Sequence, residues 1–272
     1  MAATRSRSFG GRTVALLKFN FNRNDVMPQT NKDALGQGLF FIRGLYIYAI
    51  IICSAAIVYA TRDIGPFSSP SLDILWFWLS AAIATAGALF RAMASGFAAY
   101  GTSGRVKRAP EAAELNTTGF YSIVRNPLYV GRIVNYAGLA MLSGDLAFSA
   151  IAILLSVLIY IRISAYEAAF LRSKFGEQYE KWAAATPALL PRLGGWVKPK
   201  YDFWWKRMIW REQHKLFLLA TGIFLAWFAR FSFDIAQLSS AQMIWLYVYA
   251  AILVLRLSIS ALGATGYFKD LR

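Results

Sequence analysis

The sequence predicts an all-α protein, a polytopic helical bundle that crosses a membrane about six times. The first observation is composition, because 57% of the 272 residues are hydrophobic and 16% are aromatic, which is too apolar for an ordinary soluble domain. The second is that the apolar residues come in separate blocks. The third is that lysines and arginines gather on one side of those blocks.

The apolar blocks have unequal lengths. They lie at 44–61, 74–90, 128–142, 146–161, 216–229 and 243 to about 262. A span needs about 20 residues to cross the hydrocarbon, so the first, second and last blocks are the firmest predictions. The pair within 128–161 meets at Ser143, Gly144 and Asp145, which predicts a tight helical hairpin. The fifth block is short and fits a tilted or partly inserted helix, which leaves four or five spans as alternatives.

The placement of positive charge predicts the topology. The segments before 44, at 101–125, at 162–215 and after the last block hold 24 of the 29 lysines and arginines. Cytoplasmic loops carry this excess in membrane proteins, so both termini and the two long loops are expected in the cytoplasm. We therefore divide the chain into a basic cytoplasmic tail (1–43), a membrane core (44–200), and an interfacial helix followed by two C-terminal spans (201–272).

Several classes of function are not expected. The net charge of +15 follows from topology and from contact with anionic lipid headgroups, and no basic face with interleaved aromatic residues suggests nucleic-acid binding. The only cysteine, Cys53, lies inside the first block, and the only histidine, His214, has no acid or thiol at ligand spacing. We therefore expect neither a disulfide framework nor a metal site.

The stretch GFYSIVRNPLYVG, residues 119–131, opens the third block with polar residues. Asn126 is a good helix N-cap and Pro127 is favoured at the first helical position, so a helix is predicted to begin here. The positive end of that helix and the cation of Arg125 would together attract an anion. The alternative is that Arg125 reaches to a lipid phosphate. Glu167 lies at the cytoplasmic end of the fourth span and is expected to face this helix start, which we call the doorway (residues 119–131).

These residues resemble a known family. GFYSIVRNPLYVG is similar to the G-x-Y-x-x-x-R-[HN]-P-x-Y-x-G signature of the isoprenylcysteine carboxyl methyltransferase and phospholipid methyltransferase superfamily of integral membrane methyltransferases. Glu167, Phe175-Gly176 and Tyr179 resemble the family's E-E-x-x-L-x-x-x-F-G-x-x-Y element. The following ATPALLPRL resembles its V-P-x-x-x-P tail. The match covers roughly 85–193.

The resemblance implies S-adenosylmethionine as methyl donor, bound on the cytoplasmic side by the third and fourth spans and the chain after them. The residues it implies for the cofactor pocket are Tyr121, Arg125, Asn126, Pro127, Tyr129, Gly131, Glu167 and Tyr179. Arg125 suits the donor's carboxylate, Glu167 its ammonium, and tyrosine faces its sulfonium. The chain departs from the family where Asn126 stands for a histidine and where Ala168 stands for a second acid.

The acceptor is expected to be lipidic, because a pocket at the ends of membrane spans is reached sideways from the bilayer. Arg91 and Arg132 are intramembrane cations and therefore functional candidates, which together with Arg125 form the predicted catalytic set. The alternative is that each snorkels to the interface or pairs with a backbone carbonyl. Arg256, in the last block, is expected to pair with Asp270 or to hold a lipid.

The leading function is therefore a methyltransferase (EC 2.1.1 class) that transfers a methyl group to a lipid or prenylated acceptor at the cytoplasmic membrane face. One alternative is an NADPH-dependent sterol-type reductase of the related branch, although Phe175 and Tyr179 stand where that branch has other residues. Another is a non-catalytic membrane scaffold. The expected partners are the membrane, its anionic headgroups and the acceptor, with no nucleic acid and no metal.

Overall fold

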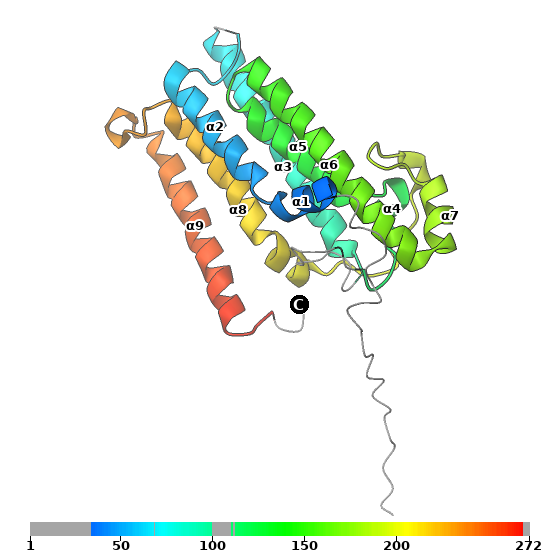
Figure 1. Ribbon diagram of the computed structural model, residues 1–272. Coiled ribbons are helices and arrows are strands. Elements are labelled where there is room, and N and C mark those ends of the chain that lie inside the picture. Colours follow the sequence, from blue (N-terminus) through cyan, green and yellow to red (C-terminus); the bar gives the residue numbers. More distant parts are fainter. Residues whose placement is uncertain (1–33, 68, 100–109, 111, 269–272) are drawn as a thin grey trace, which may run out of the picture.

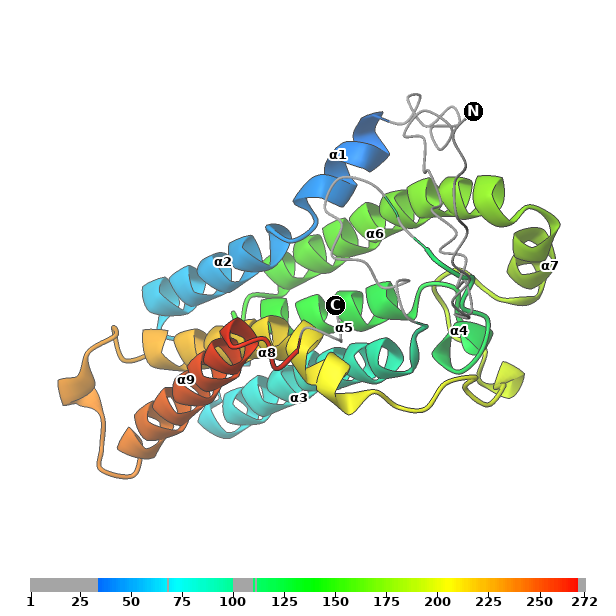
Figure 2. The same ribbon diagram turned by 90° about the horizontal axis from the view of Figure 1, so that it is seen from below.

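The structure is a computed structural model that describes residues 34–67, 69–99, 110 and 112–268. Every regular element in these residues is helical, so the all-α prediction is confirmed. The longer helices lie side by side as a bundle, with α4 and α7 at one end (Figures 1 and 2). In chain order the helices are α1 (Ala34–Ile42), α2 (Tyr46–Thr61), α3 (Pro70–Phe97), α4 (Phe120–Ile123), α5 (Pro127–Met141), α6 (Leu146–Phe175), α7 (Glu177–Ala185), α8 (Trp205–Ala229) and α9 (Met243–Ala264).

The predicted apolar blocks coincide with α2, α3, α5, α6, α8 and α9. Among the described residues, α3, α6 and α9 are long and apolar enough to cross a membrane, and α1 with α2 makes a fourth candidate, bent by 60°. α5 has 15 residues, which gives a length of about 22 Å against a hydrocarbon core of about 30 Å. Three or four candidate spans thus support a multi-pass membrane protein, and six spans stay a prediction.

The predicted hairpin joins α5 to α6. Gly144 adopts φ +71°, a left-handed conformation that glycine tolerates without a steric penalty. Asp145 then caps α6, because its side chain accepts a hydrogen bond from the backbone N–H of Phe148 at 2.7 Å. The antiparallel pair brings the start of α5 and the last turns of α6 to the same end of the bundle as α4 and α7 (Figure 1).

Small residues let α3 and α5 pack with their backbones in contact. A Cβ added to Gly87 would lie 2.3 Å from the amide nitrogen of Asn135, and one added to Gly138 would lie 2.3 Å from that of Ala84. Asn135 also donates from Nδ2 to the carbonyl of Ala84 at 2.9 Å. Close approach of this kind is typical of helix pairs in membranes. We call Gly87, Gly131 and Gly138 the glycine seam.

Two segments differ from the sequence-based division of the chain. Residues 1–33 of the expected tail lie outside the described residues, and its last part forms α1, which packs on α6. The segment 201–215 was expected to form a separate interfacial helix, but from Trp205 it runs without a break into α8. Its side chains Arg207 and Glu212 are buried, because one face of the helix turns toward α3.

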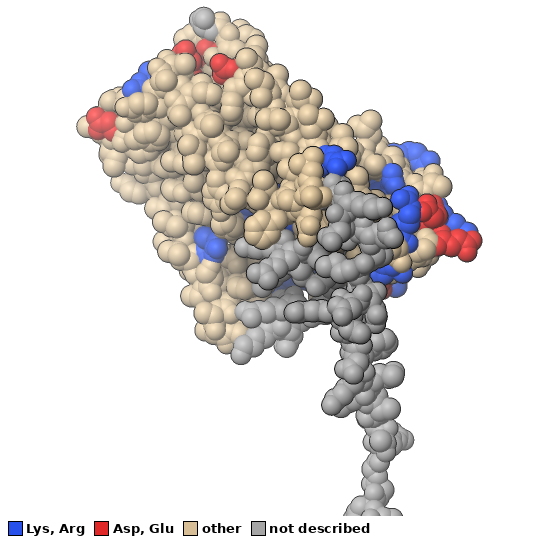
Figure 3. Space-filling view, viewed as in Figure 1, with Lys and Arg blue, Asp and Glu red and all other residues tan. Residues whose placement is uncertain are grey.

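Charged side chains mark the two ends of the bundle. Lysines and arginines gather around α7, whereas uncharged surface covers the bundle (Figure 3). The exposed cations at this end include Arg172, Lys174 and Lys181. At the other end Arg62 donates to the backbone carbonyl of Ala229 at 3.1 Å. The ends therefore differ as the charge pattern indicates, while the cytoplasmic placement of the basic end stays a prediction.

Candidate active site

The start of α5 has the predicted position but a different cap. Asn126 occupies the N-cap and Pro127 the first helical position, and the Asn126 carbonyl accepts from the N–H groups of Tyr129 and Val130 at 3.0 and 3.1 Å. The predicted capping by the Asn126 side chain is wrong. Its Nδ2 donates to the carbonyl of Ala188 at 3.0 Å instead, so the amide ties the helix start to the chain that follows α7.

Residues 186–204, which we call the return segment, hold α4 and the helix start from outside. The backbone N–H of Arg125 donates to the carbonyl of Pro187 at 2.8 Å. Further bonds join the segment or α7 to α4: Arg192 N–H to Ile123 O at 2.9 Å, Gly119 N–H to Val197 O at 2.9 Å, and Trp182 Nε1 to Tyr121 O at 3.0 Å. The backbone around Arg125 is therefore fixed on both sides.

A cavity of about 210 Å³ lies at this end of the bundle, far larger than the roughly 10–15 Å³ that one water needs on the same measure. Its walls come from α1, α3, the chain before α4, α4, α5, α6, α7 and α8. Besides the predicted site residues, its lining includes Phe40, Arg43, Ser95, Glu114, Asn116, Phe170, Trp182, Arg211, Glu212 and Lys215. The cavity is large enough for an organic ligand, and its lining mixes aromatic rings with charges of both signs.

Eight of the ten predicted site residues line this cavity: Arg91, Tyr121, Arg125, Asn126, Pro127, Tyr129, Arg132 and Glu167. Gly131 belongs instead to the glycine seam, where an added Cβ would lie 2.7 Å from the Cβ of Arg91. Tyr179 is a buried residue of α7, with its ring 5.7 Å from that of Trp182. These two residues support the wall without forming part of it.

Tyr129 and Glu167 connect α5 to α6 across the cavity. The Tyr129 hydroxyl donates to Glu167 Oε1 at 2.7 Å, and the Tyr129 ring lies 4.9 Å from that of Tyr160. Glu167 thus faces the helix start, as its place in the sequence suggested. Where the family pattern has a second acid, this chain has Ala168. The neighbour of Glu167 in the cavity is the phenol of Tyr129.

Arg125 and Tyr121 supply hydrogen-bond donors to the same wall. The Arg125 Nε is buried and has no hydrogen-bond partner among the described residues. A buried donor without a partner costs about 1–3 kcal/mol, so this atom suits a ligand that brings an acceptor. Burial first, and then the charge of Glu167, raises the pKa of the Tyr121 phenol. That phenol stays protonated at neutral pH and can donate.

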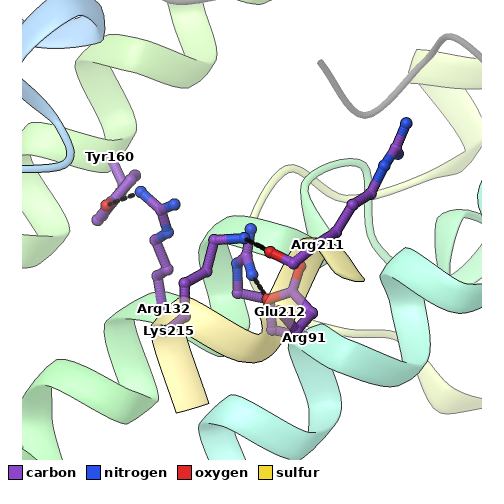
Figure 4. A network of polar contacts seen from close by, with 6 residues as sticks. All are labelled: Arg91, Arg132, Tyr160, Arg211, Glu212 and Lys215. Carbon is purple, nitrogen blue, oxygen red and sulfur yellow. Dashed lines mark hydrogen bonds and ion pairs between the residues drawn. The ribbon is translucent and has the colours of Figure 1, made fainter. Parts of the chain in front are cut away.

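The two intramembrane arginines have different partners (Figure 4). Arg91 forms an ion pair with Glu212 of α8. The sequence suggested snorkelling or a backbone carbonyl as the structural contact of Arg91, and not a carboxylate. Arg132 donates from Nη1 to the hydroxyl of Tyr160 at 3.1 Å. Arg91 is therefore neutralised by a carboxylate, whereas the partner of Arg132 is a neutral phenol.

α8 contributes residues that the motifs did not indicate. Lys215 Nζ lies 3.1 Å from Glu212 Oε1 and donates to the carbonyl of Arg211 at 2.7 Å, and all three residues line the cavity. One signal was available in the sequence. Glu212 is the only acid between Asp202 and Asp234, within a basic and aromatic stretch that leads into an apolar block, and an acid at such a place needs a buried cation.

Arg256 lies apart from the cavity, on α9. It donates from Nη1 to Gln213 Oε1 at 3.1 Å and also bonds to Ser260. The expected partner Asp270 lies outside the described residues. The contact with Gln213 joins α9 to α8, so Arg256 has a role in helix packing.

Comparison with known proteins finds a family match for the central part of the chain. Residues 76–178 match the family model described as phospholipid methyltransferase. This range holds α5, most of α3 and all of α6, and it includes the doorway and Glu167. The resemblance that the motifs indicated is confirmed. No solved structure matches the chain.

Two curated relatives carry names that refer to metal resistance. The nickel-cobalt-cadmium resistance protein NccN of Alcaligenes xylosoxydans xylosoxydans is 37% identical over 119 residues, which is 43% of this chain and 53% of the relative. The cobalt-zinc-cadmium resistance protein CzcN of Cupriavidus metallidurans is 34% identical over 151 residues, 55% of this chain and 63% of the relative. The chain thus spans only about half to two thirds of these relatives. Within the part of the chain that the structure describes, no three His, Cys, Asp or Glu side chains cluster as metal ligands.

Proposed function

We propose, on the premise that residues 76–178 belong to the phospholipid methyltransferase family, that this chain transfers a methyl group from S-adenosylmethionine to a lipid or prenylated acceptor at the cytoplasmic face of a membrane. One observation carries the proposal. The cavity brings together two residues of the family segment: Arg125, an arginine with a buried unpaired donor just before α5, and Glu167, a carboxylate on α6. The donor's methionine end carries the complementary carboxylate and ammonium.

The residues of the cavity fit such a donor. Arg125 and the N-terminal end of α5 would bind the carboxylate, because both present positive charge to the cavity. Glu167 would bind the ammonium through the oxygen that Tyr129 leaves free. Tyr121 and Trp182 add aromatic faces to the same lining, which suit the sulfonium and the adenine ring.

Methyl transfer from a sulfonium requires few catalytic groups from the protein. The donor, when bound, supplies an activated methyl group on a sulfonium, so the chain has to align the acceptor and exclude water. The return segment and α4 enclose the doorway on the solvent side. An acceptor that is already an anion, such as a carboxylate or phosphate, needs no general base. This agrees with a cavity in which cations outnumber carboxylates.

Ligand binding tests the proposal directly. S-adenosylhomocysteine at about 100 times its Kd should stabilise the detergent-solubilised chain by about 2.7 kcal/mol, a rise in Tm of roughly 5–11 °C for a chain of this size. NADPH at the same concentration should have no effect. A shift by NADPH alone would favour the reductase, and no shift by either compound would favour the scaffold.

Site variants locate the donor. Arg125→Met and Glu167→Gln should each abolish most of the shift given by S-adenosylhomocysteine. Lys174→Met and Glu177→Gln are the matched controls, because they remove one positive and one negative charge from exposed side chains at the same end of the bundle. Full binding by both site variants would reject the assignment. Mass spectrometry of membrane lipids labelled from a methyl-deuterated donor would then identify the acceptor.

The names of the relatives suggest a physiological setting. We propose that methylation by this chain contributes to tolerance of divalent metal ions, on the strength of its 37% identity to NccN and 34% identity to CzcN. Deleting the gene should lower the nickel, cobalt or cadmium concentration that stops growth. The Arg125→Met variant should fail to restore tolerance, and restoration by that variant would separate resistance from methyl transfer.

A further inference from the structure

The wall of the cavity that α8 builds lies outside the family segment. The family match ends at residue 178, whereas Arg211, Glu212 and Lys215 come from α8. The donor-binding residues proposed above lie on α4, α5, α6 and α7 and on the link between α4 and α5, and they leave this wall without a role. α8 therefore brings charged groups into the cavity for which the family motifs give no account.

Positive charge is in excess in the described lining. Six lining residues are cations and three are carboxylates: Arg43, Arg91, Arg125, Arg132, Arg211 and Lys215 against Glu114, Glu167 and Glu212. Glu114 is already bound outside the cavity, by Lys200 at 3.1 Å and by the Tyr201 hydroxyl at 2.7 Å. Cations in a confined site with low-dielectric walls attract an anion strongly. The cavity therefore has room for negative charge beyond the donor's single carboxylate.

Arg132 lacks an ion pair among the described residues. Its one hydrogen bond goes to the neutral Tyr160 hydroxyl, and no carboxylate in the described residues forms an ion pair with it. A guanidinium has five N–H donors, so most of those on Arg132 are available to a ligand. The glycine seam places Arg132 beside Arg91, because Gly131 packs against the Cβ of Arg91. The charge of Arg91 is balanced by Glu212, whereas the charge of Arg132 is not balanced by a carboxylate of its own in the described part of the chain.

Lys215 stands in the same network (Figure 4). The carboxylate that pairs with Arg91 through Oε2 also holds Lys215 through Oε1, at 3.1 Å. The Lys215 side chain is 33% exposed, against 3% for Glu212, so its ammonium can reach the cavity. Glu212 thus fixes a lysine of α8 close to the arginines of α3 and α5.

We propose that Arg132 and Lys215 form a subsite for one anionic group, a phosphate or a carboxylate carried by an acyl or isoprenoid chain. Glu212 is its positioning residue, because it neutralises Arg91 and holds Lys215 in place. The chain of the ligand would lie between helices of the bundle, whose outer surface is apolar. The inference rests on the proposed function in one respect only, which is that the bound lipid is the methyl acceptor.

Binding of dodecyl phosphate to the full chain in a non-ionic detergent tests the subsite, with inorganic phosphate as the second arm. Arg132→Met and Lys215→Met should each weaken dodecyl phosphate binding by roughly 10- to 100-fold, as expected for the loss of a hydrogen bond between charged groups. Arg132→Lys should recover part of the affinity. Inorganic phosphate should bind far more weakly than dodecyl phosphate, and equal binding of the two would overturn a lipid as the source of the anion.

Lys206→Met is the matched control, because Lys206 is an exposed lysine of α8 that does not line the cavity. It should leave dodecyl phosphate binding unchanged. Unchanged binding in both subsite variants, or an equal loss in the control, would overturn the subsite. The S-adenosylhomocysteine shift should survive in the subsite variants and show that they fold. If that shift is absent from the unmodified chain while dodecyl phosphate still binds at Arg132, the proposed function fails and the subsite stands.

Discussion

Replacing Glu212 with glutamine should destabilise the bundle more than any comparable change of a surface acid. The Glu212 side chain is 3% exposed and that of its partner Arg91 is 10% exposed, so both charges have lost most of their contact with water. Breaking a buried ion pair from one side leaves the other charge uncompensated, which costs about 3–5 kcal/mol. The amide oxygen of glutamine can still accept one hydrogen bond, so we expect the lower part of this range.

The contribution of Lys215 to this loss is small. Its side chain is 33% exposed, and water and salt screen an ion pair at that exposure, so losing the contact adds less than about 1 kcal/mol. Replacing both Arg91 and Glu212 with methionine should cost less than Glu212→Gln alone, because no unpaired charge is then left buried. The two sites should therefore show strong coupling in a double-mutant cycle.

The free energy of unfolding can be measured by titrating sodium dodecyl sulfate into maltoside micelles and following helical circular dichroism. Glu180→Gln is the control, because Glu180 pairs with Arg172 with both side chains more than half exposed, and its loss should cost under about 1 kcal/mol. Equal effects of Glu180→Gln and Glu212→Gln would refute the reasoning. The reasoning would also be refuted if the loss of stability in the methionine double variant equalled the sum of the losses in Arg91→Met and Glu212→Met.

Three further predictions concern packing, the donor site and pH. Gly138→Ala should destabilise the folded chain by about 1–3 kcal/mol through overpacking of the glycine seam. Gly38→Ala, where an added Cβ meets nothing within 4 Å, should stabilise it by about 0.5–1 kcal/mol. Thermal unfolding measures both effects. Tyr129→Phe removes the 2.7 Å hydrogen bond to the partly buried Glu167 carboxylate and should weaken S-adenosylhomocysteine binding about tenfold in calorimetry. A hydrogen bond from the Tyr201 hydroxyl, and then Lys200, lower the pKa of Glu114 below its ordinary value of 4.5. These contacts therefore stabilise the folded chain above that pH, and the stabilisation is lost as the pH falls further. The difference in Tm between wild type and Glu114→Gln should narrow on acidification, and a constant difference would contradict this assignment.

The sequence predicts the helices well because each apolar block is a local signal. A run such as 74–90 indicates a helix in the bilayer whatever its neighbours do, and α3 contains that run. The lengths of the helices are predicted less well. α6 continues to Phe175 and α8 begins at Trp205, because backbone hydrogen bonding does not stop where hydrophobicity ends. The number of spans cannot be read from hydropathy when a helix as short as α5 is packed inside the bundle.

The candidate site was predictable to the extent that it lies within motifs. Arg125 and Glu167 belong to two short patterns, and the hairpin between them is itself a local signal, so their convergence followed. The ion pair of Arg91 with Glu212 joins residues 121 positions apart, and a single sequence gives no register for two helices so distant. The side chain of Asn126 shows the same limit, because its choice of the Ala188 carbonyl over the helix cap depends on how the return segment packs.

The glycine seam makes the spacing of α3 and α5, and so the width of the cavity, independent of the surrounding membrane. Because main chain meets main chain there, the spacing between the arginines of α3 and α5 is set by backbone contact and not by bulky side chains. The outward residues of α3, such as Leu75, Leu79 and Leu89, are exposed on the bundle's surface and can vary with the lipids they meet. The same cavity can therefore be kept in bilayers of different composition when only the outward-facing residues of the bundle change.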